Sequence, residues 1–303
     1  MLFGGRYVIL KVKGSVSMKY CDLHVHSDCS DGMDTPEELV IKAKEAGLSA
    51  LALTDHNTVK GLSRFLTAAK GSGIEAIPGI EISTEHEGRE LHLVGLFVEE
   101  AYYEKISKTL APYLAKKEES NRSLCEKLNG FLAPKGLLID YEALKRENET
   151  DTLNRAHFAY KLYEMGVISS TAEGFETLLS KDGGYYYEAE KIEFAEAVAL
   201  LRSCKAVPIL AHPFLDRSYE ELKVFLPLAK SFGLVGMETD YTKFDEETTA
   251  KAKALADENG LLHSGGSDYH GARKKGVLLG KGYGNLAVPY DYLEKLKEAK
   301  ETL

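Results

Sequence analysis

Short β-rich apolar runs alternate with amphipathic helical segments in two blocks of this sequence, residues 18–100 and 191–303. In each block a strand-like run is followed by a short loop and then by apolar residues at helical spacing. Repeated strand–helix units of this kind predict a parallel sheet covered by helices. The 303 residues suffice for one β/α barrel of roughly 200–250 residues together with an insertion.

Residues 101–190, between the two blocks, differ in character from both. They are helical, rich in lysine and glutamate and poor in strand signals, so we expect an inserted helical lid. Residues 1–17 have only a short apolar stretch and no clear small-residue cleavage site, which is not the pattern of a signal peptide. We treat them as an N-terminal extension, and a start of translation at Met18 is the alternative.

Charge and cysteine content argue against several classes of function. The net charge is −9 and no basic tract stands out, so binding of duplex DNA through its phosphates is not expected. Bound cations can still attract an anionic substrate to an acidic protein. The four cysteines form no C-x-x-C pair, so we expect neither a disulfide framework nor a structural zinc site. No apolar run approaches the ~20 residues of a membrane span, and a cytoplasmic location is expected.

Histidines and acidic residues recur directly after the apolar strand runs. In a β/α barrel the catalytic groups come from the C-terminal ends of the strands, so residues far apart in the sequence meet at one rim. His24 and His26 are two residues apart on a predicted strand and therefore point to the same face. We expect one cluster, each member at a strand exit, made of His24, His26, Asp31, His56, Glu81, His92, His212, Asp268 and His270.

Each of these residues also has an ordinary structural explanation when taken alone. A single buried histidine is more often a satisfied core residue than a ligand, Asp31 could form a turn, and Asp268 could cap a helix. Glu81 is harder to explain, because an unpaired carboxylate inside an apolar strand is costly. Buried together, nine such groups imply two or three divalent cations, with one carboxylate bridging two of them. The ligand set suits Mn²⁺, our first choice, or Zn²⁺ or Fe²⁺, rather than Ca²⁺.

The same segments, taken as a set, resemble the PHP (polymerase and histidinol phosphatase) family of metal-dependent phosphoesterases. HVHSDCSDG, TDHN, PGIEIS, LHLVG, AHP and GGSDYHG occur in the family's order, over nearly the whole chain from Met18. The resemblance implies a distorted (β/α)7 TIM-like barrel with up to three metals at its C-terminal rim. It assigns His24, His26, Glu81 and Asp268 to one metal. A second metal would share Glu81 and take His92 and His212, and a third would take Asp31, His56 and His270.

The resemblance also implies roles for residues beside the metals. Asp55 would orient neighbouring ligands, and His86 and His263 would be surface or structural residues. In the insertion, TLNRAHFA resembles an R-x-H-x-A element of the PHP branch that acts on nucleotides. There Arg155 would bind a substrate phosphate with help from Ser83. His157 would bind substrate and act in catalysis with Glu81 and Asp268. An ordinary amphipathic helix start explains Arg155 and His157 equally well.

The implied reaction is hydrolysis of a phosphate ester by a metal-activated water. The branch points to a small phosphorylated substrate, either the 3′-phosphate of nucleoside 3′,5′-bisphosphates or short 5′-phosphorylated oligonucleotides. One alternative is a histidinol-phosphate phosphatase. A second is a non-catalytic or proofreading module associated with a DNA polymerase, although no polymerase region is present. A third, an amidohydrolase, usually needs a bridging lysine, which no strand end provides. Oligomeric state is not visible in the sequence.

Overall fold

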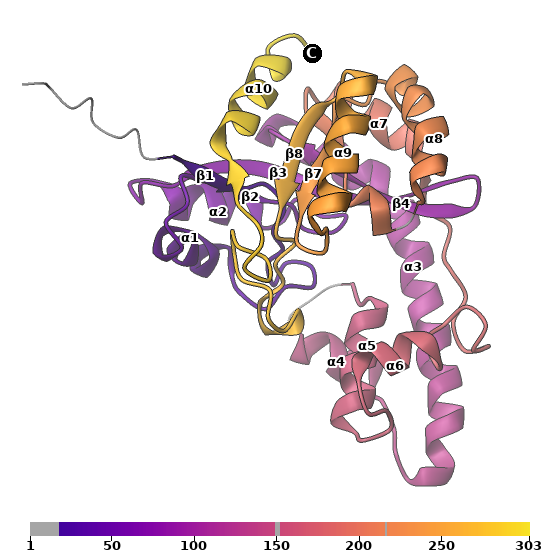
Figure 1. Ribbon diagram of the computed structural model, residues 1–303. Coiled ribbons are helices and arrows are strands. Elements are labelled where there is room, and N and C mark those ends of the chain that lie inside the picture. The colour runs from indigo at the N-terminus through magenta and orange to yellow at the C-terminus, as the bar shows by residue number, and fades with distance from the viewer. Residues whose placement is uncertain (1–17, 149–151, 216) are drawn as a thin grey trace, which may run out of the picture.

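A curved sheet forms the centre of the molecule. The computed structural model describes residues 18–148, 152–215 and 217–303, so the N-terminal extension predicted for residues 1–17 lies outside the described residues. Within them, a nine-stranded sheet has the order β8-β7-β6-β4-β3-β2-β1-β9, with β5 beside β3 (Figure 1). The strands are β1 (Tyr20–Asp22), β2 (Ala50–Leu53), β3 (Glu75–His86), β4 (Arg89–Leu96), β5 (Ile192–Glu193), β6 (Val207–Leu210), β7 (Gly236–Tyr241), β8 (Leu262–Gly266) and β9 (Val288–Pro289).

Hydrogen bonds between the chain after β1 and the chain at the end of β8 close the sheet into a barrel. The Leu23 amide donates to the Gly265 carbonyl oxygen at 3.1 Å. The Asp268 amide donates to the His24 carbonyl oxygen at 2.8 Å. Two residues further along, the His26 amide donates to the carbonyl oxygen of Tyr269 at 3.0 Å. The predicted barrel is confirmed, and predicted metal ligands lie along its closing seam.

Two strands break the parallel order that the sequence predicts: the short edge strand β9, which is antiparallel to β1, and β4. β4 runs antiparallel to both of its neighbours, β3 and β6. β3 and β4 form a hairpin in which His86 pairs with Arg89 across the turn residues Glu87 and Gly88. Both turn residues have positive φ, 53° and 70°, as in the type I′ turns that match the twist of paired strands. The expectation of a wholly parallel sheet is wrong at β4, because a hairpin returns the chain without a crossover helix.

Helices cover the barrel on its outside and at one end. They are α1 (Pro36–Glu45), α2 (Leu62–Ala69), α7 (Phe194–Ser203), α8 (Tyr219–Phe232), α9 (Glu246–Asn259) and α10 (Tyr290–Lys300). In β2, Leu51 and Leu53 join the large core cluster, whereas Ala50 and Ala52 join a second cluster that includes Leu293 of α10. Alternate residues of a strand point to opposite faces, so both faces of this strand are buried. In Figure 1, α10 lies at the end of the barrel away from the helices of residues 101–190.

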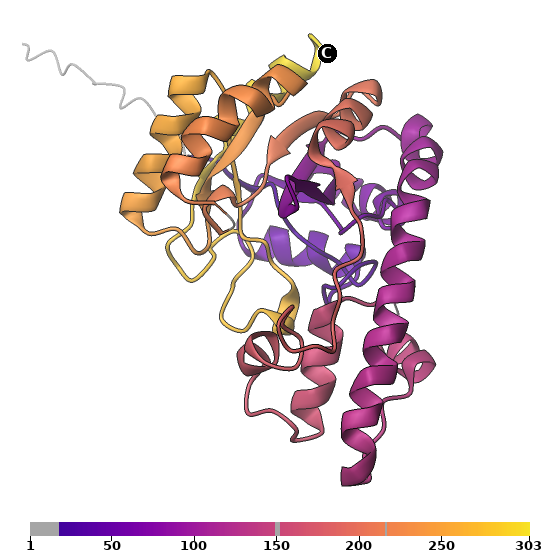
Figure 2. The ribbon, with the colours of Figure 1, turned by 90° about the vertical axis from the view of Figure 1, so that its right-hand side faces the viewer.

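The helices of residues 101–190 form a separate layer beside the barrel. The layer consists of α3 (Tyr103–Leu132), α4 (Tyr141–Glu147), α5 (Arg155–Glu164) and α6 (Thr171–Glu176). α3 runs from the barrel to the far tip of the layer (Figure 2). Leu124 and Leu128 of α3 pack with Leu144, Phe158 and Leu162 in a small apolar core of their own. None of the helices in the described ranges is long and apolar enough to cross a membrane.

Gly130 offers a test of α3. It is an exposed residue inside the helix, and a β-carbon added there would meet no atom within 4 Å. Glycine inside a helix costs stability because it loses more backbone freedom on folding than alanine does. We expect Gly130→Ala to raise the free energy of unfolding by about 0.5–1 kcal/mol, measured by urea denaturation. Gly236→Ala is the opposite case, since its β-carbon would lie 2.8 Å from the Leu262 carbonyl oxygen. A lower unfolding free energy in Gly130→Ala would contradict the placement of Gly130 inside α3.

Candidate metal centre

The seam that closes the barrel carries two pairs of ligand-type residues. His24 and His26 follow β1, and Asp268 and His270 follow β8. The two histidines after β1 are fully buried, and the pair after β8 is nearly so. A β-carbon on Gly266 would lie 2.4 Å from the His24 β-carbon, so this approach of the two chains requires glycine. The end of β8 therefore sets the spacing between the two pairs.

The β3–β4 hairpin supplies further candidates from within its strands. Its register pairs Ser83 with His92, and Glu81 lies two residues before Ser83, so all three project from the same face. His56 follows β2 and forms a backbone bridge with Glu81, and His212 follows β6. The expectation that every candidate leaves a strand end is wrong for Glu81 and His92. β2 pairs with β3 only as far as Pro78, so the hairpin continues beyond the barrel and carries mid-strand positions at its rim.

The Glu81 carboxylate lies at the centre of the cluster, and its two oxygens face different histidines. Oε1 lies 2.8 Å from His92 Nδ1 and 3.0 Å from His212 Nε2. Oε2 faces ring nitrogens of His24, His26 and His56 at 3.1, 3.1 and 3.2 Å, respectively. A carboxylate with one oxygen toward each set of imidazoles can bridge two cations.

The charges in the cluster follow from burial and from these contacts. Burial alone would raise the pKa of Glu81, but neighbouring imidazoles such as His24 and His92 hold that pKa well below its usual range, so the carboxylate is ionised. Burial lowers the pKa of His56 to about 3. Its imidazole is therefore neutral at neutral pH and keeps a lone pair that can bind a metal.

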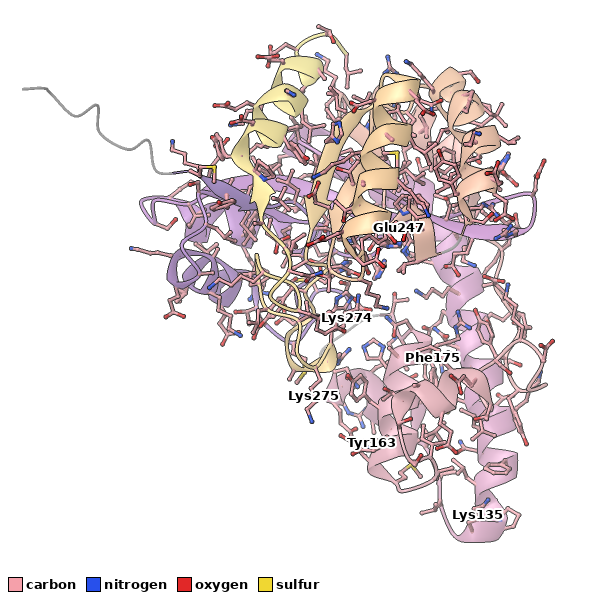
Figure 3. All side chains as sticks on the ribbon, in the orientation of Figure 1. Lys135, Tyr163, Phe175, Glu247, Lys274 and Lys275 are labelled. Carbon is pink, nitrogen blue, oxygen red and sulfur yellow. The ribbon has the colours of Figure 1, made fainter. Side chains whose placement is uncertain are left out.

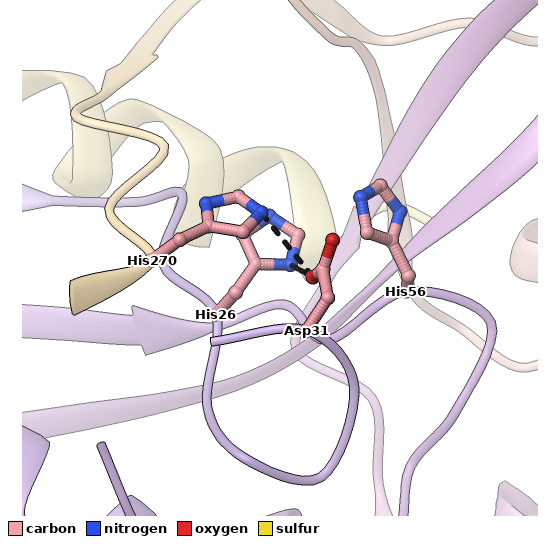
Figure 4. A group of neighbouring side chains, drawn as sticks. All are labelled: His26, Asp31, His56 and His270. Carbon is pink, nitrogen blue, oxygen red and sulfur yellow. Dashed lines mark ion pairs between the residues drawn. The ribbon is translucent and has the colours of Figure 1, made fainter. Parts of the chain in front are cut away.

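The outer part of the cluster surrounds Asp31. Asp31 Oδ1 lies 3.2 Å from His270 Nε2 and 3.7 Å from His26 Nδ1, with His56 alongside (Figure 4). Asp268 Oδ1 lies 3.3 Å from His26 Nε2. Ligand atoms lie within 4.8 Å of one another in three groups: His26, Asp31, His56 and His270; His24, His26 and Glu81; and His56, Glu81 and His92. The structure thus brings the nine predicted ligands together at one rim, and their binding of metal stays a prediction.

Several buried polar atoms of the cluster have no hydrogen-bond partner among the residues that the structure describes. They are His24 Nε2, both ring nitrogens of His26, His56 Nδ1 and Glu81 Oε2. Leaving buried polar groups without partners is costly, and native proteins pair nearly all of them. Divalent cations would occupy these lone pairs at once, so the residues fit a site for metal ions.

Glu238 holds two of the candidate ligands, and the sequence analysis missed it. Glu238 is buried on β7, where Oε1 lies 2.8 Å from His24 Nδ1. Oε2 accepts a hydrogen bond from the His212 amide at 2.6 Å. A carboxylate on Nδ1 fixes the ring orientation and leaves Nε2 of His24 facing Glu81. The available signal was a glutamate inside a buried strand, the same signal that singled out Glu81.

Two further buried carboxylates hold the loops that carry the cluster. Asp55 accepts hydrogen bonds from the Ser27 amide at 2.7 Å and from the Ser30 hydroxyl at 2.6 Å. It therefore fixes the turn that precedes Asp31, in keeping with the orienting role that the sequence analysis gave it. Asp22 accepts a hydrogen bond from the Ser267 amide at 2.8 Å, and so fixes the residue before Asp268.

The two histidines that the prediction left outside the site lie apart from the cluster. The His86 ring packs against the Phe225 ring at 5.2 Å. His263 contacts the Thr239 hydroxyl at 3.1 Å and the Asp257 carboxylate at 3.0 Å. Both sets of contacts are structural.

A cavity of about 300 Å³ lies between the barrel rim and the helical layer. His56, His92 and Ser83 line it from the barrel, and Arg155 and Phe175 line it from α5 and α6. Figure 3 shows Phe175 on the helical layer and Lys274 on a barrel loop next to that layer. Arg155, the predicted phosphate ligand, has its guanidinium 5.8 Å from the ring of Phe175 and 4.5 Å from that of Tyr186. Cationic and aromatic groups thus lie next to the cluster.

His157 has a local structural task at the start of α5. It is buried, and its Nδ1 accepts a hydrogen bond from the Asn154 amide at 2.9 Å. In return, Asn154 Oδ1 accepts from the amides of Ala156 and His157 at 3.0 and 3.3 Å. Asn154 also donates from Nδ2 to Asp31 Oδ2 at 2.7 Å. His157 does not line the cavity, so a contact with substrate stays a prediction.

Comparison with known proteins identifies the family. A model of the PHP domain matches residues 22–156. A 5′-3′ exoribonuclease from Haemophilus influenzae is 31% identical over 84% of this chain and 91% of its own length. A phosphoribosyl 1,2-cyclic phosphate 1,2-diphosphodiesterase from Eggerthella lenta is 30% identical over 82% and 94%. A 3′,5′-nucleoside bisphosphate phosphatase from Chromobacterium violaceum is 26% identical over 87% and 91%.

A solved structure shares the fold. It is described as a metal-dependent phosphoesterase from Bifidobacterium adolescentis, and it matches with a TM-score of 0.78 at 24% sequence identity. The match covers 92% of this chain and 95% of that chain, so barrel and helical layer recur together. Because the curated relatives match over most of both lengths, the protein belongs to the PHP-domain family of metal-dependent phosphoesterases.

Proposed function

We propose that the protein hydrolyses phosphate esters of nucleotides. The preferred substrate in this proposal is the 3′-phosphate of nucleoside 3′,5′-bisphosphates, and the second is a short 5′-phosphorylated oligonucleotide. The observation that carries the proposal is the cluster of imidazole and carboxyl groups around Glu81, beside a cavity whose lining includes Arg155, two lysines and aromatic rings as well as two glutamates. Relatives named as an exoribonuclease and as a bisphosphate phosphatase support nucleotides as the substrate class.

The proposal includes two or three divalent cations, with Mn²⁺ first and Zn²⁺ or Fe²⁺ as alternatives. One ion would be held by His24, His26, Glu81 and Asp268. Glu81 would also hold a second ion with His92 and His212, and the third would lie among Asp31, His56 and His270. When bound, such ions lower the pKa of water and stabilise negative charge on a phosphate.

Residues of the chain itself would position the substrate. Arg155, held against Tyr186 and Phe175, can offer its planar fork of donors to a phosphate. Burial lowers the pKa of His157 to about 3, so its imidazole is neutral at neutral pH. With Nδ1 accepting from Asn154, the proton lies on Nε2, which can donate a hydrogen bond but is not an effective acid. We therefore give His157 an orienting role.

Hydrolysis of a set of substrates tests the proposal, measured as phosphate release from the phosphomonoesters and as cleavage of the dinucleotide. Adenosine 3′,5′-bisphosphate, a 5′-phosphorylated dinucleotide and histidinol phosphate are compared with and without Mn²⁺. We expect Mn²⁺-dependent turnover of the first two, with kcat/KM for histidinol phosphate at least about 100-fold lower, because histidinol has no nucleoside to occupy the large cavity beside the cluster. A preference for histidinol phosphate would favour the alternative enzyme. No turnover of any of them, at full Mn²⁺ occupancy, would contradict the proposal.

A further inference from the structure

A second, smaller cavity of about 80 Å³ adjoins the large one. The two share a wall made of five residues: His56, Asn57, Leu114, Lys117 and Asn154. His56 is a candidate metal ligand, so the smaller cavity lies directly beside the cluster. A group bound in it would be close to the reacting centre but separate from it.

The lining of the smaller cavity is cationic in an otherwise acidic protein. Among the residues that the structure describes, it includes Lys60 and Lys117 but no aspartate or glutamate, whereas the chain as a whole has a net charge of −9. The hydroxyl-bearing residues Ser30, Thr58 and Thr152 complete much of the wall. Cations and hydroxyl groups without carboxylates are suited to an anion such as a phosphate group.

Polar groups on the shared wall are mostly engaged with one another. Asn57 donates from Nδ2 to the Ser83 hydroxyl at 3.2 Å and accepts from the Ser83 amide at 3.0 Å. Asn154 is bound to Asp31 and to the first turn of α5. These contacts fix the shape of the wall and leave few donors free for a ligand.

Lys117 differs from the other cations beside the cluster. Lys191 pairs with Glu188 and lies 3.6 Å from Glu90, and Arg155 stacks on Tyr186. Lys117 makes no hydrogen bond or ion pair within the described ranges, although it is only partly exposed between the two cavities. Burial lowers its pKa, and the positive charges of Lys191 and Arg155 add to that effect, although the negative charges of Asp31 and Glu90 oppose it. Three ammonium donors therefore face cavity space.

We propose that Lys117 and the smaller cavity bind a second phosphate of the substrate, one that is not hydrolysed. The inference rests on the proposed function, and it defines the substrate class as compounds with two phosphate groups. The phosphate that reacts lies at the cluster around Glu81, the nucleoside occupies the large cavity, and the second phosphate reaches Lys117. That second phosphate is the 5′-phosphate in both substrates: the 3′-phosphate reacts in a nucleoside bisphosphate, and the internucleotide phosphate reacts in a 5′-phosphorylated dinucleotide.

The test compares substrates that differ by one phosphate. In Lys117→Ala, we expect kcat/KM for adenosine 3′,5′-bisphosphate to fall roughly 10- to 100-fold, the loss typical of a charge-assisted hydrogen bond. Turnover of adenosine 3′-monophosphate, which lacks the second phosphate, should stay within about threefold of wild type. Lys117→Arg, which keeps the charge, should recover much of the loss. Lys108→Ala is the matched control, since Lys108 lies on the same helix, is exposed and pairs with Glu104.

A parallel measurement with the dinucleotide tests whether both substrates place their 5′-phosphate at Lys117. A loss for both the bisphosphate and the dinucleotide supports this shared site, and a loss for the bisphosphate alone would contradict it. Adenosine 5′-monophosphate, which retains only the second phosphate, should inhibit Lys117→Ala more weakly than wild type. Equal losses for bisphosphate and monophosphate, or no loss for either, would overturn the assignment of Lys117. Wild-type protein inactive on all three nucleotides would instead refute the proposed function.

Discussion

Glu81→Gln is expected to lower kcat/KM for adenosine 3′,5′-bisphosphate by at least about 10³-fold, because bound cations supply several kcal/mol of charge stabilisation in phosphate hydrolysis. Glutamine keeps the volume of glutamate but replaces one oxygen with an amide group that cannot bind a metal. Both Glu81 oxygens face imidazoles, one toward His92 and His212 and the other toward His24, His26 and His56. The change should therefore weaken two cation sites at once.

Metal content and thermal stability provide readouts beside activity. At 100 times its dissociation constant, a cation that binds only the folded state stabilises it by about 2.7 kcal/mol. We expect Mn²⁺ to raise the Tm of the wild-type protein and to leave the Tm of Glu81→Gln nearly unchanged. Glu85→Gln makes the same chemical change four residues along β3, away from the candidate ligands, and should behave as wild type. Normal metal content in Glu81→Gln would refute the bridging role.

Glu238→Gln is expected to weaken Mn²⁺ binding about 10- to 100-fold, the usual effect of removing a residue that orients a metal ligand. Glu238 accepts from two donors, the His24 ring and the His212 amide, at 2.8 and 2.6 Å. In glutamine an NH₂ group, which donates hydrogen bonds, replaces one of the two accepting oxygens. One of the two contacts would then place a donor against a donor. The His24 ring is then free to turn away from Glu81.

A Mn²⁺ titration of metal-depleted protein, followed by turnover, measures this effect. The expected signature is a shift in the Mn²⁺ concentration that gives half-maximal activity, with activity largely regained at high Mn²⁺. Glu246→Gln, an exposed change on α9, is the matched control. Loss of activity that no Mn²⁺ concentration restores, with an unchanged Mn²⁺ affinity, would place Glu238 in a different role.

Much of the fold was accessible from the sequence because apolar periodicity and helix caps are local signals. The barrel is confirmed, and residues 101–190, which the sequence analysis expected to be helical, contain α3, α4, α5 and α6. β4 was misjudged because strand direction depends on the connection. The two-residue turn of Glu87 and Gly88 was the local evidence for a hairpin. A short loop with a glycine favours an antiparallel return over a crossover.

Some residues of the candidate site could likewise be predicted from local sequence signals, and others could not. His24 and His26 were accessible because H-x-H on a strand places two imidazoles on one face, and Glu81 because a carboxylate in an apolar strand needs a partner. Glu238 and Lys117 were not found. Their roles depend on neighbours that are distant in the sequence: His24 for Glu238, and the walls of two cavities for Lys117. Such contacts follow from the closure of the barrel and the placement of α3, which no local pattern specifies.

The Asn154 side chain contacts both the helical layer and the barrel rim. Binding events at these two places are therefore thermodynamically coupled. Its side chain starts α5 in the helical layer and holds Asp31 at the barrel rim. Any ligand that favours this placement of Asp31 also favours the docked arrangement of the layer, and the coupling free energy is the same in both directions. A cation held as proposed by Asp31, His56 and His270 would thus raise the affinity for a nucleotide bound against the layer. The nucleotide would raise the affinity for the cation by the same factor.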